Sequence, residues 1–361
     1  MLYLKSDELK LGMRLAKPLY NSAGVLLYNR NTTINERVYE QIQSLNLYGL
    51  YVLEPAEPLP PINDEEVEFE RFQTVSCNML QEIFDTALHN HQSKQAETLC
   101  MEIMKRYGGL GRKIVFMQNI RGPHDFVYKH CLNVAILCTL ICNNLGIDRK
   151  EIYYLINASF YHDIGKILAP PELINKTGKL SREELNIIRN AELNGFEAIR
   201  NNYDLPAGIR RYITQLKVEL CNKMPEMESK EQSLLLGTDI LRVADMYDTL
   251  TAMRVYKKPT SEYSAIKFLL EHEDEYNEKV VEALIEAIHI LPPGACVELT
   301  NGEKGIVLKE NEFYHLRPTV LGFESQQTYD LGNRKVYSEI QIKDIMKTMD
   351  NRFVMSSIDA Q

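Results

Sequence analysis

Apolar residues recur at three- and four-residue spacing through most of the chain between Arg71 and about His289, which is the period of amphipathic helices. One such helix is expected to end at residues 143–146 (NNLG), and residues 181–184 (SREE) form a capping box that opens another. A chain with this pattern folds around packed helices, so the sequence predicts a large all-helical core.

Short strand patterns lie on both sides of this core. Before it, residues 26–28 (LLY) and 49–53 (GLYVL) are strand candidates, and one helix is expected near Ile34 to Leu45. After it, residues 296–308 contain two strand-like runs around Asn301-Gly302, a dipeptide typical of a type I′ hairpin turn. The predicted fold class is mainly α, with small β-rich N-terminal and C-terminal modules flanking the helical core.

A proline-rich and then acidic stretch, PAEPLPPINDEEVEFE, contains too little apolar material to pack, and we expect a linker there. The length of 361 residues also favours more than one domain. The predicted organisation is a β-rich N-terminal module (1–55), a linker (56–70), a helical domain (71–290) and a C-terminal β-rich module (291–361).

Composition excludes several classes of function. A net charge of −9 argues against binding of long nucleic acids, which need a basic surface, but leaves a small phosphate-bearing ligand open. No uninterrupted apolar run approaches the ~20 residues of a membrane span, and the N-terminus lacks the apolar stretch of a secretory signal. Seven cysteines without a Cys-x-x-Cys pair favour reduced, structural thiols. We therefore expect a cytoplasmic protein without a membrane span.

Two histidines of the helical core are candidate metal ligands. His130 lies in the apolar stripe of its helix, where an imidazole is either a hydrogen-bonded core residue or a ligand. His162-Asp163 closes an apolar helical run just before Gly165 and Lys166. Neighbouring side chains on a helix point about 100° apart, so both reach one ion only near a helix end. That position makes the His-Asp pair a plausible part of a metal site.

A third segment supplies another carboxylate. Apolar residues surround Asp245, which therefore needs a cation or a hydrogen-bond donor when buried. Asp248, one turn on, is either a residue that orients a ligand or a surface or arginine-paired acid. Two imidazoles with two carboxylates suit Fe, Mn, Co, Ni or Zn better than Ca or Mg. The expected ligands of one divalent transition metal ion are His130, His162, Asp163 and Asp245.

An ion with four protein ligands leaves room for a reaction. It can lower the pKa of bound water from ~15.7 toward ~7 and hold a phosphoryl oxygen. Lys166, four residues after His162, is either a clamp for the phosphate charge or a solvated lysine after a helix end. Asp163 and Lys166 are the expected catalytic residues, and no further cofactor is expected.

These segments resemble the HD-GYP family of cyclic di-GMP phosphodiesterases, a branch of the HD phosphohydrolase superfamily. The matching segments are residues 128–134 (YKHCLNV), 161–167 (YHDIGKI) and 245–251 (DMYDTLT), the last followed by Arg254 and Tyr256. Residues 9–27 and 297–320 are similar to the terminal modules of some members.

The resemblance implies a metal-dependent phosphohydrolase in bacterial cyclic di-GMP signalling, in which metal-activated water attacks a phosphodiester. The implied partner is a cyclic dinucleotide or another phosphate-bearing small molecule. The flanking β modules offer surfaces for a protein partner, and a homodimer is a further expectation.

The chain departs from the family pattern at the ligands of a second metal ion. The expected histidines fall on Ala191, four residues before Gly195, and on residues 215–216 (Gln-Leu), while the Gly-Tyr-Pro signature falls on residues 223–225 (Lys-Met-Pro). No histidine lies between Asp163 and Glu271, so a shifted alignment does not supply them. The possible replacements are Glu192, Glu197 and Glu219. The sequence predicts that the second site is lost.

Two hypotheses follow. The first is a phosphohydrolase of HD-GYP type that works with a reduced, one-metal site. The second is a catalytically inactive signalling or scaffold protein that keeps the fold and one ion while binding a nucleotide or a protein partner.

Overall fold

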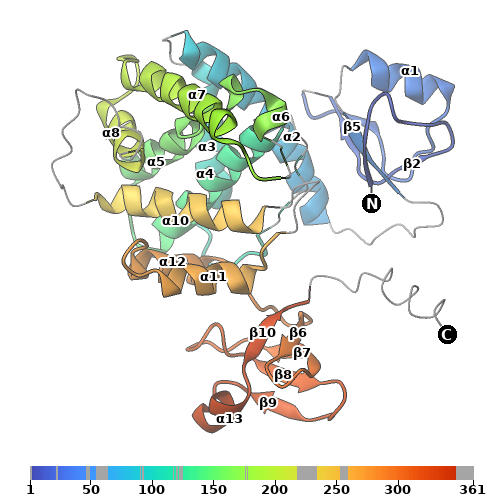
Figure 1. Ribbon diagram of the computed structural model, residues 1–361, viewed down its shortest axis with the longest axis vertical. Helices are drawn as coiled ribbons and strands as arrows, with labels where there is room; N and C mark the ends of the chain where they lie inside the picture. The colour runs from blue at the N-terminus through green and yellow to red at the C-terminus, as the bar shows by residue number, and fades with distance from the viewer. Residues whose placement is uncertain are drawn as a thin grey trace. The chain divides into compact units, whose positions relative to one another are not determined.

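The computed structural model describes residues 2–21, 23–45, 49–53, 64–89, 91, 93–116, 118, 121, 125–174, 176, 178–217, 234–252 and 259–346. The chain divides into two compact units. The first comprises Met1–Leu110, Met117–Asp248 and Ala252–Lys258, and the second comprises Gly111–Phe116, Thr249–Thr251 and Pro259–Gln361. Most of the structure is helical, so the predicted mainly α class is confirmed (Figure 1).

The N-terminal part of the first unit contains small antiparallel sheets and one helix. Three strands pair in the order β1-β5-β2, and two more form a β3-β4 ribbon. The elements are β1 (Leu2–Lys5), β2 (Arg14–Leu15), β3 (Leu19–Tyr20), β4 (Leu26–Tyr28), α1 (Glu36–Ser44) and β5 (Gly49–Leu53). Asn35 caps α1 by accepting a hydrogen bond from the backbone N–H of Val38 at 3.0 Å. Ile34 and Ile42 are fully buried at the centre of this small core.

The helices of the first unit follow the predicted periodicity. They are α2 (Asp64–Leu88), α3 (Lys94–Tyr107), α4 (Phe126–Asn144), α5 (Arg149–Tyr161), the 3-10 turn η1 (Ile164–Leu168), α6 (Pro171–Ile174), α7 (Arg182–Arg200), α8 (Ala207–Leu216) and α10 (Leu236–Thr251). The expected capping box at Ser181 opens α7, with hydrogen bonds in both directions between Ser181 and Glu184.

Helix α2 begins at Asp64, inside the segment for which a linker was expected. Phe69 and Phe72 are buried, so this acidic stretch does carry an apolar face. Asp64 and Glu65 stand in the first turn, where carboxylates interact favourably with the helix dipole. The remainder of the expected linker, residues 56–63, lies outside the described residues.

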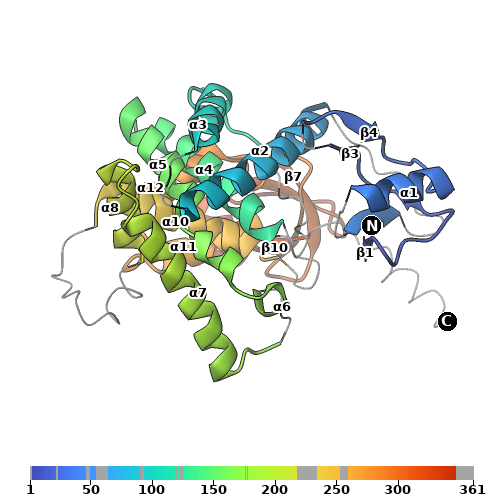
Figure 2. The same cartoon turned by 90° about the horizontal axis from the view of Figure 1, so that it is seen from above.

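Helix α4 is the centre of the helical unit. It packs against α2, α3 and α5 (Figure 2). By length and composition it could cross a membrane, but 83% of its apolar window is buried inside the protein, as in the core helix of a soluble protein. Its cysteines Cys131, Cys138 and Cys142 are free and buried, and burial raises the pKa of the Cys138 thiol to about 12.

The second unit combines two helices with an antiparallel sheet in the order β10-β6-β7-β8-β9. Its elements are α11 (Glu262–Glu271), α12 (Glu278–Ala287), β6 (Cys296–Leu299), β7 (Lys304–Lys309), β8 (Thr319–Gly322), β9 (Thr328–Asp330), α13 (Arg334–Glu339) and β10 (Ile342–Ile345). The hydroxyl of Tyr263 donates to the carbonyl of Ile342 at 3.1 Å and ties α11 to β10. Both helices belong to the same compact unit as the sheet, whereas the predicted helical domain continued to residue 290.

The hairpin between β6 and β7 forms where it was predicted, but its turn is of another type. A type I′ turn needs positive φ at both central residues. Here Gly302 has φ of 86°, while Asn301 is not among the positive-φ residues of the described chain. The N–H of Gly302 bonds to the carbonyl of Leu299, and the N–H of Leu299 bonds to the carbonyl of Glu303. Glycine thus supplies the left-handed residue of a longer turn.

Candidate metal centre

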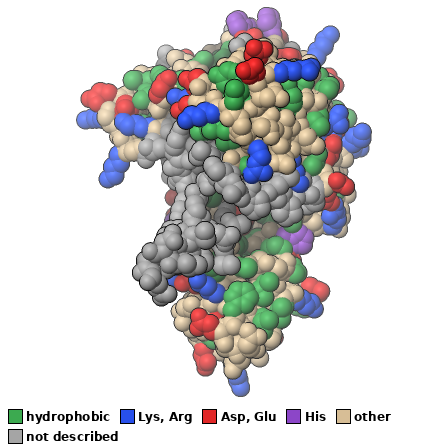
Figure 3. All heavy atoms as spheres, turned by 90° about the vertical axis from the view of Figure 1, so that its right-hand side faces the viewer, with side chains coloured by type: hydrophobic (Ala, Val, Ile, Leu, Met, Phe, Trp, Pro, Cys, Tyr) green, Lys and Arg blue, Asp and Glu red, His purple; other side chains and the backbone are tan. Residues whose placement is uncertain are grey.

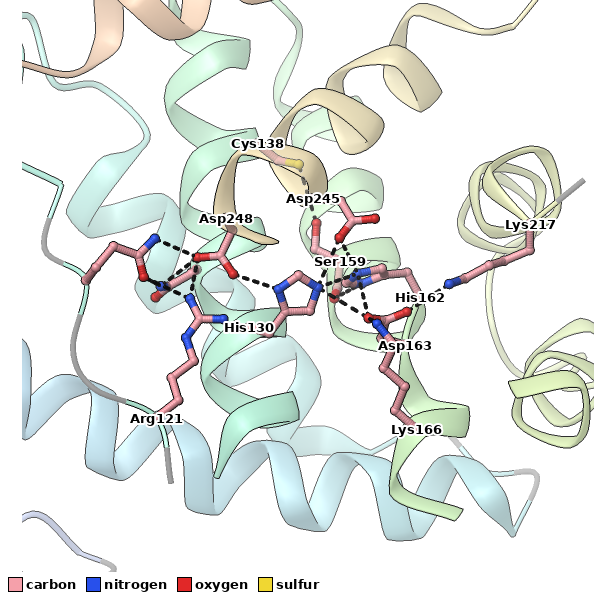
Figure 4. Close-up of polar contacts among 12 residues, drawn as sticks. Arg121, His130, Cys138, Ser159, His162, Asp163, Lys166, Lys217, Asp245 and Asp248 are labelled. Carbon is pink, nitrogen blue, oxygen red and sulfur yellow. Dashed lines mark hydrogen bonds and ion pairs between the residues drawn. The ribbon is translucent and has the colours of Figure 1, made fainter. Parts of the chain in front are cut away.

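Four side chains from three helical segments converge in the first unit (Figure 4). His130 comes from the second turn of α4, His162 and Asp163 from the end of α5, and Asp245 from α10. One nitrogen or oxygen atom of each lies within 4.8 Å of the corresponding atom of every other. The structure therefore brings together the four predicted metal-binding residues.

The distances within this cluster suit a single ion. The Nε2 atom of His130 lies 3.2 Å from Nε2 of His162, 3.1 Å from Oδ1 of Asp245 and 3.3 Å from Oδ2 of Asp163. Nε2 of His162 lies 3.7 Å from each of the same two oxygens. Ligands that bind one ion at about 2.1 Å stand roughly 3.0–3.4 Å apart when adjacent. Of these distances, only the two of 3.7 Å from His162 exceed this range, and a small approach of His162 would bring all four atoms around one ion.

The end of α5 explains how two neighbouring residues aim at one point. His162 is the last residue with helical backbone angles, and Asp163 departs from them with φ of −117° and ψ of 16° before the turn η1 begins. The 100° step between successive helical side chains therefore no longer applies.

A glycine pair fixes this turn against α7. A Cβ added to Gly165 would lie 2.5 Å from Cα of Glu192, and one added to Gly195 would lie 2.3 Å from Cα of Gly165. Two backbones approach this closely only where side chains are absent. The contact sets the position of the segment that carries Asp163 and Lys166.

Each imidazole is oriented by an acceptor at its other nitrogen. Nδ1 of His130 lies 2.6 Å from Oδ2 of Asp248, and Nδ1 of His162 lies 2.8 Å from the carbonyl oxygen of Ser159. A carboxylate and a carbonyl only accept, so both Nδ1 atoms donate. In the neutral rings the Nε2 lone pairs then face each other across 3.2 Å, an arrangement that calls for a cation between them.

Asp248 is itself held by three donors. It is fully buried, and its Oδ1 accepts hydrogen bonds from Gln118 and Asn133, each at 2.9 Å, and from the guanidinium of Arg121. Asp248 thus contacts both a candidate metal ligand and an arginine. From the sequence, a residue that orients a ligand and an arginine-paired acid were alternatives. Arg121 is buried as well.

The electrostatics of the cluster favour positive charge at its centre. Burial lowers the pKa of His130, but hydrogen bonds to three aspartates outweigh burial and hold it above the usual histidine value. Burial likewise lowers the pKa of His162, and the charge of Asp163 reverses that shift. Burial raises the pKa of Asp245, yet hydrogen bonds to both histidines bring it well below its usual value. The two carboxylates facing the imidazoles are therefore ionised.

Two lysines bind the two oxygens of Asp163. Lys166 donates to Oδ2, and Lys217, the residue after α8, donates to Oδ1 at 2.8 Å. Burial raises the pKa of Asp163, but the two ammonium groups lower it far more. Lys166 was predicted as a phosphate clamp, and the structure places its ammonium on a candidate metal ligand.

Arg121 and Lys217 were missed in the sequence. Neither residue belongs to an apolar series or a short motif. Each meets its aspartate only through the packing of segments that are distant in the sequence.

The positions at which a second ion was considered hold other groups. Ala191 is buried in α7, and the side-chain oxygen of Gln215 accepts hydrogen bonds from Thr238 and Leu235. The four-residue cluster includes neither Glu192 nor Glu197. Glu219, residues 223–225, Arg254 and Tyr256 lie outside the described residues.

Residues 114–280 match the family model described as HD domain, and this span holds the whole cluster. This span of the chain is therefore similar to HD domains. A relative from Pseudomonas aeruginosa, named cyclic di-GMP phosphodiesterase PA4108, is 27% identical over 69% of the chain and 60% of its own length. A relative from Vibrio cholerae, named 3'3'-cGAMP-specific phosphodiesterase 2, is 28% identical over 44% of the chain and 30% of its own length.

These names agree with the HD-GYP type that the motifs of this chain resemble. The chain spans less than two thirds of the length of either relative. Among solved structures, Bd1817, an HDG"Y"P protein from Bdellovibrio bacteriovorus, is similar with a TM-score of 0.47 at 14% identity, covering 78% of this chain and 97% of the other.

Proposed function

We propose that this chain is a metal-dependent phosphohydrolase that cleaves a phosphodiester bond of a cyclic dinucleotide such as cyclic di-GMP. The observation that carries the proposal is the convergence of the Nε2 atoms of His130 and His162 with oxygens of Asp163 and Asp245. The substrate class is supported by the names of the relatives, which act on cyclic di-GMP or on 3'3'-cGAMP.

The residues present fit one divalent ion of the Fe, Mn, Co, Ni or Zn group, because imidazole and carboxylate donors are combined. His130, His162, Asp163 and Asp245 would hold it. Such an ion lowers the pKa of a water molecule from ~15.7 toward ~7 and polarises a phosphoryl oxygen. Asp248 and the Ser159 carbonyl keep both imidazoles in the orientation that this binding needs.

The charges of the centre favour an anionic substrate once an ion is bound. The centre contains three carboxylates, those of Asp163, Asp245 and Asp248, and three cations, those of Lys166, Lys217 and Arg121. These formal charges cancel, so a divalent ion leaves a net charge of +2, or +1 if Glu192, which acts on Lys217, is included. A chain of net charge −9 can therefore attract a phosphodiester locally. On the face drawn in Figure 3, by contrast, acidic and basic side chains are interspersed.

A pocket of about 490 Å³ adjoins the cluster at Lys166. It combines two further basic residues, Lys176 and Lys179, with apolar side chains that include Phe126 and Leu173. Basic and apolar groups together suit a nucleotide, whose phosphates need cations and whose bases need apolar contact. Lys166 lines the pocket and donates to Asp163 of the cluster. Its proposed role is to donate to a phosphoryl oxygen as negative charge develops there.

The second hypothesis, a catalytically inactive signalling protein, has one observation in its favour. Ala191 and Gln215 occupy the positions expected for ligands of a second ion. The side-chain oxygen of Gln215 accepts hydrogen bonds from Thr238 in α10 and from the backbone of Leu235, the residue before α10. Under that hypothesis the centre stabilises the fold or a bound partner without turnover.

Metal analysis of the purified chain, combined with turnover assays, separates the two hypotheses. Cyclic di-GMP, its linear dinucleotide and a generic phosphodiester would be tested with each of the five metals. We expect hydrolysis of a cyclic dinucleotide, reduced at least roughly a hundredfold in His162→Ala because a ligand is lost. His89→Ala, on a histidine that is 73% exposed, is the control. No turnover of any substrate with any metal would favour the inactive protein, and His162→Ala would then lower only thermal stability or partner binding.

A further inference from the structure

We propose that the Lys217 ammonium is a fixed second cation of the metal centre, which limits the centre to one metal ion and binds a phosphate oxygen of the substrate. The inference rests on the metal centre of the proposed function. It does not require turnover.

The two oxygens of Asp163 have different surroundings. Oδ2 faces the imidazoles, at 3.3 Å from Nε2 of His130 and 3.7 Å from Nε2 of His162. Oδ1 points away from them and accepts from Lys217 at 2.8 Å. Figure 4 shows Lys217 reaching this oxygen from a different side than Lys166. Oδ2 therefore faces the imidazoles and also accepts from Lys166, whereas Oδ1 accepts from Lys217.

A second ion at Oδ1 would have to displace this ammonium. The side chain of Lys217 is only 16% exposed and that of Asp163 only 1%, so the pair is shielded from water. An ammonium supplies charge but has no lone pair for a metal. Among the neighbouring positions, Ala191 has no donor atom, the oxygen of Gln215 already accepts two hydrogen bonds, and the charge of Glu192 acts on Lys217. The positive charge beside Oδ1 is thus supplied by the Lys217 side chain and not by a second metal ion.

The same ammonium is suited to bind phosphate. It has three N–H donors and gives one to Asp163, which leaves donors for a second acceptor. Lys166 stands at the other oxygen of Asp163. A phosphate bound to an ion between the imidazoles would therefore meet an ammonium group on either side of Asp163, and charge-assisted contacts of this kind are strong.

The test uses the full chain reconstituted with excess Mn²⁺ and then freed of unbound metal. Metal content would be measured by mass spectrometry, and binding of inorganic phosphate by calorimetry, for the wild type, Lys217→Met, Lys217→Arg and the control Lys267→Met. Lys267 is 58% exposed and lies in α11. Thermal melts would establish that each variant is folded.

We expect one ion per wild-type chain, and a loss of phosphate affinity in Lys217→Met of roughly tenfold to a hundredfold, the range of one charge-assisted hydrogen bond. Lys217→Arg, which keeps the charge, should retain most of the affinity, and Lys267→Met all of it. Two ions per wild-type chain, or unchanged phosphate affinity in folded Lys217→Met, would overturn the inference. Should Lys217→Met not fold, the wild-type metal count and Lys217→Arg still decide.

The outcomes also distinguish this inference from the proposed function. One ion and Lys217-dependent phosphate binding without turnover would leave the inference standing and remove the phosphohydrolase. Turnover with two ions bound per chain would support the phosphohydrolase and overturn the inference.

Discussion

Oδ2 of Asp248 lies 2.6 Å from Nδ1 of His130, on the side of the ring opposite the metal cluster. The other oxygen of Asp248 accepts from Arg121, Gln118 and Asn133. The orientation of a candidate ligand thus depends on a carboxylate one helical turn beyond Asp245, and through it on a loop arginine.

Asp248→Asn should weaken metal binding about 10- to 100-fold. A neutral amide holds the His130 ring less firmly and makes its Nε2 lone pair a weaker metal ligand. Competition with a fluorescent chelator would measure the affinity. Asp85→Asn, on a carboxylate that is 82% exposed, is the matched control. Equal affinity in Asp248→Asn and wild type would show that this contact does not tune the site.

Arg121→Leu should lower the free energy of unfolding of the metal-free protein by about 3–5 kcal/mol, because it leaves the buried Asp248 without its cation. Urea denaturation measures this. The double variant Arg121→Leu/Asp248→Leu should lose less than the sum of the two single variants, since it removes both charges. Strict additivity would argue against a direct coupling.

Gly195→Ala should destabilise the fold by about 1–3 kcal/mol and displace the turn that carries Asp163, because the added methyl meets the backbone of Gly165. A loss of metal affinity should accompany the lower melting temperature. Gly109→Ala is the control, since nothing lies within 4 Å of its added Cβ. Wild-type behaviour of Gly195→Ala would mean that α7 can move away at little cost.

Metal uptake at pH 7 should release protons. Burial lowers the pKa values of His130 and His162, but the surrounding carboxylates raise them above the usual histidine value, so the metal-free pair carries a proton near neutrality. An ion requires both Nε2 atoms without protons. The apparent affinity should therefore rise with pH, with about one proton or more released per ion. Calorimetry in buffers of different ionisation enthalpy counts these protons, and a count of zero would contradict the raised pKa values.

The sequence could indicate the candidate ligands because each carries a local mark. His130 interrupts an apolar stripe, His162-Asp163 stands at a helix end, and Asp245 lies among apolar neighbours. These marks follow from the cost of burying polar groups, which acts on each residue where it stands. The helices themselves were predictable for a similar reason, since their periodicity is local.

Two of the three cations of the centre, Lys217 and Arg121, could not be found in this way. Lys217 meets Asp163 across 54 positions of sequence, and Arg121 meets Asp248 across 127. These partners meet only when segments that are distant in the sequence pack together. The turn after β6 and the start of α2 differed from expectation for a related reason, because hydrogen bonds and buried phenylalanines decided between local alternatives.

The balance of three carboxylates against three cations has a consequence for the order of events in the cell. Many small metal-binding domains unfold without their ion, because their ligands repel or remain unsatisfied. Here Lys166 and Lys217 pair with Asp163, Arg121 pairs with Asp248, and Asp245 lies beside the two imidazoles before any ion is bound. We therefore expect the chain to fold first and acquire its metal later, so that occupancy follows the supply of the ion around it.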